Sequence, residues 1–308
     1  MTAILFDLFL VAAGIAVLLF GGDFLVRGAA ALARRLGVAP LIVGLTVVAF
    51  GTSAPEMVVS AAASLTGAPG IALGNIVGSN IANVFLVLGL PAIIAPLATA
   101  APGVRTNAVL ALGACVILVA LTFDRVLSLH EGAILFALII GYVIYLGVHA
   151  SRATDDPVVA ELTDVDGMER LPSSTLAIAL TTLVGIIALP LGANILVEGA
   201  RDLATAAGVS EAVIGLTIIA FGTSLPELAT AMVAAMRRHS EMAIGNVIGS
   251  NIFNVFAVGG IAGVSAGAIG QSVAVEAGFF QLDYWVMIAA SAIVLIYAMR
   301  RQPVGRLT

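Results

Sequence analysis

Charged residues are scarce in this 308-residue chain, and lysine is absent. Only 10% of the residues are Asp, Glu, Lys or Arg, whereas a soluble domain usually has about a quarter. Together with the 61% share of hydrophobic residues, this composition excludes a soluble globular protein. Apolar runs long enough to cross a hydrocarbon core of about 30 Å recur along the chain. The sequence therefore predicts an all-α polytopic membrane protein.

Other absences narrow the possible functions. The single cysteine, Cys115, can form no intramolecular disulfide, so it does not identify a redox compartment. The chain has no basic stripe with interleaved aromatics, which argues against nucleic acid as a partner. No His/Asp/Ser or zinc-type grouping is present, so we expect neither an enzyme nor a cofactor. Residues 1–26 contain no Lys or Arg, so we expect no cleaved signal peptide.

Hydropathy predicts nine spans, divided by one polar segment. The spans lie near residues 4–26, 39–65, 69–95, 104–123, 130–150, 174–200, 211–236, 241–266 and 283–299. The polar segment at 151–173 is rich in Asp, Glu and Pro. We therefore divide the chain into a first half at 1–150, an acidic linker at 151–173 and a second half at 174–308.

The arginines predict how the chain crosses the membrane, because positive charge is enriched in cytoplasmic loops. With the N-terminus outside, only Arg125 and Arg201 fall on the outer side. The inner side then receives Arg34, Arg35, Arg105, Arg152, Arg170, Arg237, Arg238, Arg300, Arg301 and Arg306. We predict a multi-pass inner-membrane protein with its N-terminus outside and with its linker and C-terminus in the cytoplasm.

A seven-residue motif occurs twice, as FGTSAPE ending at Glu56 and as FGTSLPE ending at Glu227. At the same offset of 171 residues, the segment GNIVGSNIANVF at 74–85 returns as GNVIGSNIFNVF at 245–256. The two copies are five spans apart, an odd number, so the halves must have opposite orientations. Inverted repeats with interrupted hydrophobic segments at matching positions indicate a transporter whose binding site lies near the membrane midplane.

Pro55 interrupts the second span just before its glutamate. Proline has no N–H, its ring clashes with the carbonyl of Gly51, and it disfavours helical geometry at Ala54. We expect the helix to unwind around residues 51–54 and the carbonyls of residues 49–52 to lose their helical partners. In a bilayer, such carbonyls are tolerated where they line a cavity or meet a ligand. A cation is such a ligand.

Each motif copy offers carboxylate, carbonyl and hydroxyl oxygens, and Ca²⁺ takes about six to eight such ligands. Thr52 and Ser53 share a helical face with Glu56. The third span adds a polar stripe at Asn75, Ser79 and Asn83. The second half repeats the pattern with Thr223, Ser224, Pro226, Glu227, Asn246, Ser250 and Asn254. These elements predict an oxygen-lined cage whose two carboxylates balance one Ca²⁺.

The glutamates are stronger evidence for a site than the other polar residues are. A carboxylate at mid-membrane costs at least about 2.5–3.5 kcal/mol, so Glu56 and Glu227 are functional candidates by default. Ser and Asn stripes also join helices by hydrogen bonds without binding any ion. The GxxxG pairs at 74–78 and 245–249 indicate close helix packing.

The paired GTSxPE and GNxxGSNxxN motifs resemble the two repeats of the cation/Ca²⁺ exchanger superfamily, in particular its prokaryotic sodium/calcium exchanger branch. The resemblance covers essentially the whole chain. It implies a core of spans two, three, seven and eight, across which spans one and six slide. It also implies a Ca²⁺ site formed by Glu56, Glu227 and the carbonyls of Thr52 and Thr223. The matching Na⁺ positions are Ala49, Ser53 and Ser79 on one side and Ala220, Ser224 and Ser250 on the other, with Asn83 and Asn254 in the middle.

Two departures from the family pattern stand out. Some relatives carry Asp at one of the Asn83 and Asn254 positions, and its absence here argues against K⁺ co-transport. At offset 171, the fifth span should recur near 301–321, but the sequence ends at Thr308. We therefore expect four spans in the second half, either because the chain is shortened or because it is a nine-span variant.

The function expected is a secondary-active Na⁺/Ca²⁺ antiporter that works by alternating access, with the bilayer, Ca²⁺ and Na⁺ as its partners. Serine and carbonyl groups beside each glutamate favour Na⁺ as the counter-ion. A Ca²⁺/H⁺ antiporter is the alternative, because a buried glutamate can carry a proton. A passive cation channel would need a continuous polar path, whereas the polar residues gather near the two motif pairs.

Overall fold

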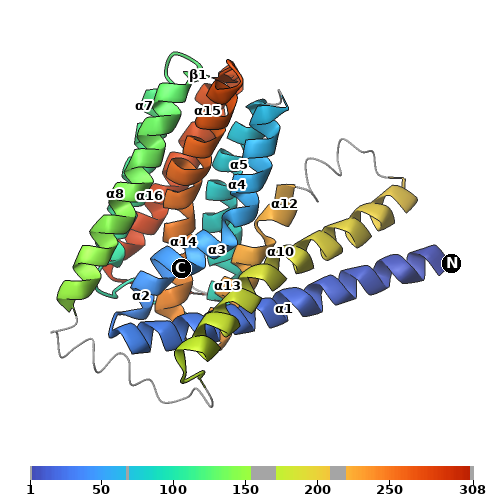
Figure 1. Ribbon diagram of the computed structural model, residues 1–308, viewed down its shortest axis with the longest axis vertical. Coiled ribbons are helices and arrows are strands. Elements are labelled where there is room, and N and C mark those ends of the chain that lie inside the picture. Colours follow the sequence, from blue (N-terminus) through green and yellow to red (C-terminus); the bar gives the residue numbers. More distant parts are fainter. Residues whose placement is uncertain (1, 67–68, 154–170, 209–219, 306–308) are drawn as a thin grey trace.

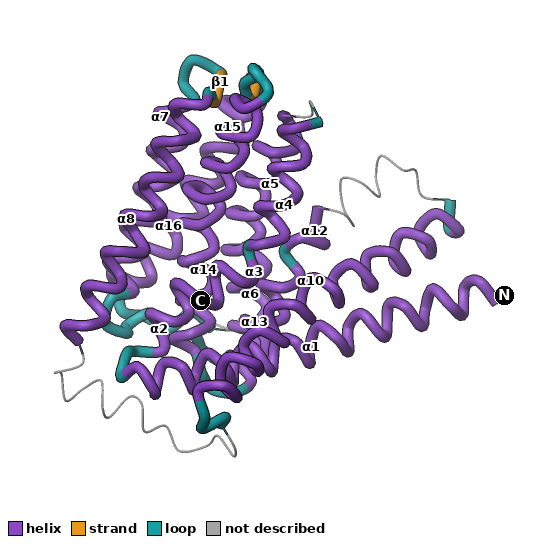
Figure 2. The backbone as a smooth tube through the Cα atoms, in the orientation of Figure 1, coloured by secondary structure: helices purple, strands orange, loops and turns teal. Residues whose placement is uncertain are grey.

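The computed structural model describes residues 2–66, 69–153, 171–208 and 220–305, and these residues are almost entirely helical (Figures 1 and 2). Within them, seven helices are long and apolar enough to cross a membrane, and a bent pair adds an eighth. The uninterrupted long helices are α1 (Thr2–Leu36), α7 (Val104–Leu121), α8 (Leu129–Ala153), α10 (Thr175–Ala206) and α16 (Tyr284–Arg300). The predicted span at 211–236 is described only from residue 220, as α12 (Ala220–Thr223) and α13 (Leu225–Met236).

Four spans change their helical form along their length. The second consists of α2 (Pro40–Val43), η1 (Gly44–Val48), α3 (Ala49–Thr52) and α4 (Ala54–Leu65), with a bend of 43° before α4. The third consists of α5 (Pro69–Ala82), η2 (Asn83–Leu88) and α6 (Gly89–Ile94). The eighth consists of α14 (Ser240–Phe253), η4 (Asn254–Val258) and α15 (Gly259–Ala268). The η segments are π-helical, as is η5 (Phe279–Asp283), which leads into α16.

Helices α1 and α10 form an antiparallel pair that is inclined to the other long helices (Figure 1). Glycine recurs every seventh residue on each helix, at Gly14, Gly21 and Gly28 and at Gly185, Gly192 and Gly199. A Cβ atom at any of these positions would lie 3.0 Å or less from the partner helix. Gly14 faces Leu196 and Gly28 faces Thr182, so the two helices run in opposite directions. The two glycine series are themselves 171 residues apart, and the inverted repeat therefore includes these helices.

The centre of the bundle is α14, which is buried along almost its whole length. Gly245 packs on Leu41 and Leu45, and Gly249 packs on Leu45 and Ala49, so α14 runs parallel to the first half of the second span. Helix α15 packs antiparallel on α8, where Gly263 meets the backbone of Gly132. Consecutive spans of a membrane protein alternate in direction, so spans two and eight should run the same way and spans five and eight opposite ways. The two observed packings agree with this alternation.

Two short strands, β1 (Val126–Leu127) and β2 (Val273–Ala274), pair antiparallel and join the loops that follow α7 and α15. Most of the linker predicted at 151–173 lies outside the described residues. The helix ends differ from the sequence expectation chiefly in α1, which continues from the predicted end at residue 26 to Leu36. It spans 35 residues because no proline or polar cluster interrupts it before Arg34.

Candidate functional site

The break in the second span is narrower than the sequence predicted. Only Ser53 leaves helical geometry, and Pro55 then occupies the first turn of α4, where its missing N–H is tolerated. The carbonyl of Ala49 accepts the Ser53 N–H at 3.0 Å and the Thr52 hydroxyl at 3.4 Å. The expectation that the carbonyls of residues 49–52 would all be freed is therefore wrong for Ala49. The break is short because proline is accepted in the first turn of a helix, so α4 can begin directly after Ser53.

The second repeat breaks in the same way. Ser224 has φ −88° and ψ 2°, close to the φ −83° and ψ 2° of Ser53. In both repeats, the backbone N–H two residues after the proline donates a hydrogen bond to the carbonyl of the motif serine. Met57 donates to Ser53 at 3.2 Å, and Leu228 donates to Ser224 at 3.1 Å. The motif thus determines the local backbone, and each break places its glutamate in the first turn of a new helix.

Glu56 and Glu227 are each only 1% exposed. Both carboxylate oxygens of Glu56, and Oε2 of Glu227, have no hydrogen-bond partner among the described residues. Oε1 of Glu227 accepts a hydrogen bond from the Ser53 hydroxyl at 3.2 Å. Neither glutamate belongs to an ion pair in the described part of the chain. A buried carboxylate without a partner is costly, so this pair requires a cation or protons.

Further unpartnered polar atoms lie on the helices that pack against the glutamates. Within residues 2–66, 69–153, 171–208 and 220–305, Oδ1 of Asn83, both amide atoms of Asn254 and the hydroxyl of Ser224 are buried without a partner. Asn83 begins η2, which packs on α13, and Asn254 begins η4, which packs on α4. Each glutamate-bearing helix therefore contacts the asparagine-bearing segment of the opposite repeat.

The π-helical segments were missed by sequence reasoning. Of the four in the described residues, two begin at Asn83 and at Asn254, and a third ends at Val48, directly before Ala49. Short π-helical segments inside α-helices are rare, and they occur frequently at functional sites. The only sequence signal for them is indirect, because the two asparagines stand at equivalent positions of the repeat.

Contacts between the two repeats bring segments with predicted sodium positions from both halves side by side. Ala49 lies against Gly249, and the Ser250 hydroxyl lies 3.5 Å from that of Thr52. The segment that carries Ala49 and Thr52 therefore lies beside the segment of the other repeat that carries Ser250. The reason is that the first half of span two packs on α14 and not on its sequence neighbour α5.

The remaining candidates lie on the same elements. Ser53, Thr52 and Ser79 are buried, and Ser79 follows Asn75 by one turn of α5. Thr223 is half-buried and donates to Oδ1 of Asn75 at 3.4 Å. Ala220 is described by its backbone, as the first residue of α12. No group of three His, Cys, Asp or Glu side chains gathers in the described ranges, so the candidate site there is an oxygen site with two carboxylates.

Comparison with known proteins identifies the family. The family model described as sodium/calcium exchanger protein matches residues 6–148 and 177–308. The chain is 37% identical over 290 residues to the putative antiporter CaxA of Alkalimonas amylolytica, covering 93% of this chain and 88% of that protein. It is 35% identical over 295 residues to the inner membrane protein YrbG of Escherichia coli (strain K12), covering 94% and 88%. A solved structure of the sodium-calcium exchanger NCX_Mj, soaked with Na⁺ and Sr²⁺, superimposes with a TM-score of 0.83 at 30% identity, covering 99% of this chain and 94% of that one.

Proposed function

This chain belongs to the sodium/calcium exchanger family, and from that membership we propose that it exchanges Ca²⁺ for Na⁺ by alternating access. It is a multi-pass membrane antiporter and not an enzyme. The observation that carries the proposal is the pair Glu56 and Glu227, which together hold three buried carboxylate oxygens without a partner in the described structure. Such oxygens are strong ligands for a divalent cation.

In this proposal Ca²⁺ binds between the two glutamates, and the backbone carbonyls of Thr52 and Thr223 add neutral oxygens. The flanking Na⁺ ligands are Ala49, Ser53, Ser79, Ala220, Ser224 and Ser250. The unpartnered amide oxygens of Asn83 and Asn254 supply further polar contacts in the middle. Ca²⁺ and Na⁺ compete for overlapping oxygens, so release of one ion accompanies binding of the other.

We also propose the orientation and the domain division. The N-terminus lies outside, and the linker at 151–173 and the C-terminus lie in the cytoplasm of an inner-membrane protein. Arg34 and Arg35 end α1, and Arg237 follows α13 and contacts α1, which supports a common cytoplasmic end for these helices. The halves at 1–150 and 174–308 are the two inverted repeats.

A Ca²⁺/H⁺ antiporter is the second candidate. The feature in its favour is that no arginine, lysine or histidine of the described chain pairs with Glu56 or Glu227. Protons could then neutralise the two carboxylates once Ca²⁺ leaves. Against it, hydroxyl groups at Ser53 and Ser224 stand beside the glutamates, where they suit Na⁺ better than a proton.

One transport assay separates the two candidates. The purified protein is reconstituted in liposomes loaded with Na⁺, and ⁴⁵Ca²⁺ uptake is measured into choline medium with and without a protonophore. We expect uptake that requires internal Na⁺ and is unaffected by the protonophore. Uptake that ignores Na⁺ and requires a pH gradient would overturn Na⁺ coupling and favour the proton antiporter.

A further inference from the structure

The asparagines of the two polar stripes differ in how their amide groups are used. Asn83 and Asn254 carry amide oxygens without a partner among the described residues. In Asn75 and Asn246, by contrast, both the amide nitrogen and the amide oxygen are engaged. The sequence cannot separate these pairs, because all four residues belong to the same repeated motif.

The bonds of Asn75 and Asn246 form a crossed arrangement. Asn246 donates to the backbone carbonyl of Glu227 at 3.4 Å and accepts the hydroxyl of Thr52 at 3.2 Å. Asn75 donates to the backbone carbonyl of Glu56 at 3.3 Å and accepts the hydroxyl of Thr223 at 3.4 Å. Each asparagine therefore joins the glutamate of its own repeat to the threonine of the other repeat.

This arrangement assigns a role to the side chains. An amide held at both ends has a fixed plane, and its oxygen faces the threonine that donates to it. We infer that Asn75 and Asn246 are positioning residues and not cation ligands. They keep each glutamate-bearing helix at a fixed distance from the broken helix of the opposite repeat. The inference rests on the proposed function, since it assumes that the glutamates bind the transported cation.

The threonine hydroxyls provide the cleanest test. Thr223→Val and Thr52→Val remove the hydroxyl but keep the side-chain volume and the backbone carbonyl that is proposed as a ligand. Thr223→Val is expected to raise the KM for Ca²⁺ about 5-fold, the effect of losing one buried hydrogen bond, with little change in maximal rate. Thr52→Val is expected to raise it at least as much, because that hydroxyl also contacts the Ala49 carbonyl and the Ser250 hydroxyl. Thr223→Ser keeps the hydroxyl and is expected to restore the wild-type KM. The matched control is Thr66→Val, because among the described residues that hydroxyl bonds only to the preceding turn of its own helix, to Ala62 at 2.8 Å and Ala63 at 3.3 Å.

A double-mutant cycle tests the pairing directly. Asn75→Ala and Thr223→Val remove the two ends of one bond, so the double variant should raise KM no more than the worse single variant. Additive effects would overturn the inference, and so would loss of Ca²⁺ binding in Asn75→Ala as complete as that in Glu56→Gln. Equilibrium ⁴⁵Ca²⁺ binding in detergent is measured in parallel. That readout does not depend on Na⁺, so it decides the positioning role even if Na⁺-driven exchange fails.

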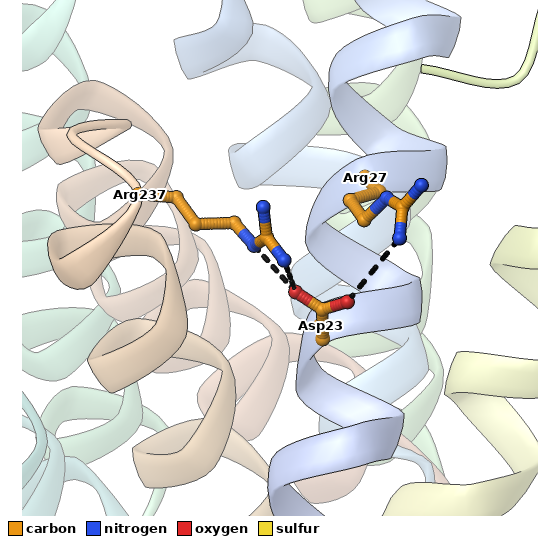
Figure 3. A network of polar contacts seen from close by, with 3 residues as sticks. All are labelled: Asp23, Arg27 and Arg237. Carbon is orange, nitrogen blue, oxygen red and sulfur yellow. Dashed lines mark hydrogen bonds and ion pairs between the residues drawn. The ribbon is translucent and has the colours of Figure 1, made fainter. Parts of the chain in front are cut away.

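An independent observation concerns the C-terminal end of α13, the helix that carries Glu227. Asp23 of α1 lies between Arg27 and Arg237, as Figure 3 shows. Arg27, one turn along the same helix, is 3.6 Å away, whereas Arg237 follows the end of α13 and contacts Asp23 through Nε and Nη2. Within the described residues, Asp23 and Arg237 form the one ion pair that joins two different helices.

This ion pair joins the α1–α10 helix pair to the rest of the bundle. Helices α1 and α10 are packed together along their glycine series, and α1 meets the rest of the bundle chiefly at α13. Gly22 lies there, where an added Cβ would be 3.1 Å from the carbonyl oxygen of Ala229. The ion pair thus fixes the α1–α10 pair against the helix that carries Glu227.

The ion pair has no counterpart in the other repeat. At the offset of 171 residues, Asn194 stands where Asp23 does, and Thr66 stands where Arg237 does. A pair present on one side only stabilises one arrangement of an inverted repeat over its mirror arrangement. We propose that Asp23 and Arg237 form a latch that favours the access state described by this structure and opens in the other state.

The latch is tested by comparing the two faces of the protein. In oriented vesicles, the KM for Ca²⁺ is measured on each side, and the ratio reports the balance of access states. Asp23→Asn and Arg237→Gln should each change this ratio about 2- to 5-fold in the same direction, and the double variant should equal either single variant. Arg238→Gln, at the neighbouring exposed arginine, is the control. An unchanged ratio in both single variants, or additive changes, would overturn the latch.

Discussion

Ser53 donates a hydrogen bond to Glu227 at 3.2 Å, whereas the equivalent Ser224 has no partner among the described residues. The two motif copies are nearly identical in sequence, and their backbone breaks have nearly the same angles. The difference therefore arises from how the repeats are placed around each other. Glu227 accepts a hydrogen bond from a serine of the opposite repeat, whereas the carboxylate of Glu56 accepts none in the described structure.

This asymmetry predicts unequal effects of the same substitution. Ser53→Ala removes a hydrogen bond to a carboxylate, so the KM for Ca²⁺ should rise about 5-fold or more. Ser224→Ala removes no such bond and should change the KM for Ca²⁺ less than about 2-fold while weakening activation by Na⁺. Both constants are measured by ⁴⁵Ca²⁺ uptake at varied ion concentrations. Equal effects on Ca²⁺ would contradict the described asymmetry.

The unpartnered carboxylates predict that Ca²⁺ stabilises the fold through them. At 100 times its Kd, a ligand adds about 2.7 kcal/mol to the free energy of unfolding. Glu56→Gln and Glu227→Gln should abolish exchange and lose this stabilisation, while the unfolding temperature without Ca²⁺ stays at or above that of the wild type. Thermal unfolding with Ca²⁺ and with a chelator measures both. A variant that kept normal exchange would remove its glutamate from the proposed site.

The glycine contacts predict that the α1–α10 pair tolerates no added side chain. At Gly185 a Cβ would lie 2.5 Å from the backbone nitrogen of Leu25, and backbone cannot move aside as a flexible side chain can. Gly185→Ala should therefore cost about 1–3 kcal/mol of stability. Gly141→Ala in α8 is the matched control, because a Cβ there meets no described atom within 4 Å. Thermal unfolding in detergent compares the two, and an equal loss of stability in both would contradict this packing.

Several features of this molecule could be read from sequence alone. The long apolar runs predict the spans, and the repeated motif singles out Glu56 and Glu227, which the structure buries in equivalent first turns. These features are local, since hydropathy and proline geometry depend on neighbouring residues. The seven-residue glycine spacing, repeated at offset 171, was a further local signal, and it could have predicted the pairing of α1 with α10.

Features that depend on which helices become neighbours could not be predicted in this way. The contact of Ala49 with Gly249, and the bonds from Thr52 to Asn246 and from Thr223 to Asn75, join residues of different repeats. A periodic pattern shows which face of a helix is polar, but not which other helix will cover it. For the same reason the open Ser224 and the engaged Ser53 are indistinguishable in sequence.

The single cysteine predicts a built-in probe of unfolding. Cys115 is fully buried in α7, and its sulfur lies 3.3 Å from the Ser291 hydroxyl of α16. Thiol reactivity requires access for the reagent, and the burial of Cys115 denies that access. The folded protein should therefore react with a maleimide dye at least about 100-fold more slowly than the unfolded chain. Dye fluorescence during heating should rise at the temperature at which helicity is lost, and Cys115→Ser should abolish the signal. Rapid labelling at room temperature would show that α7 and α16 separate in the native protein.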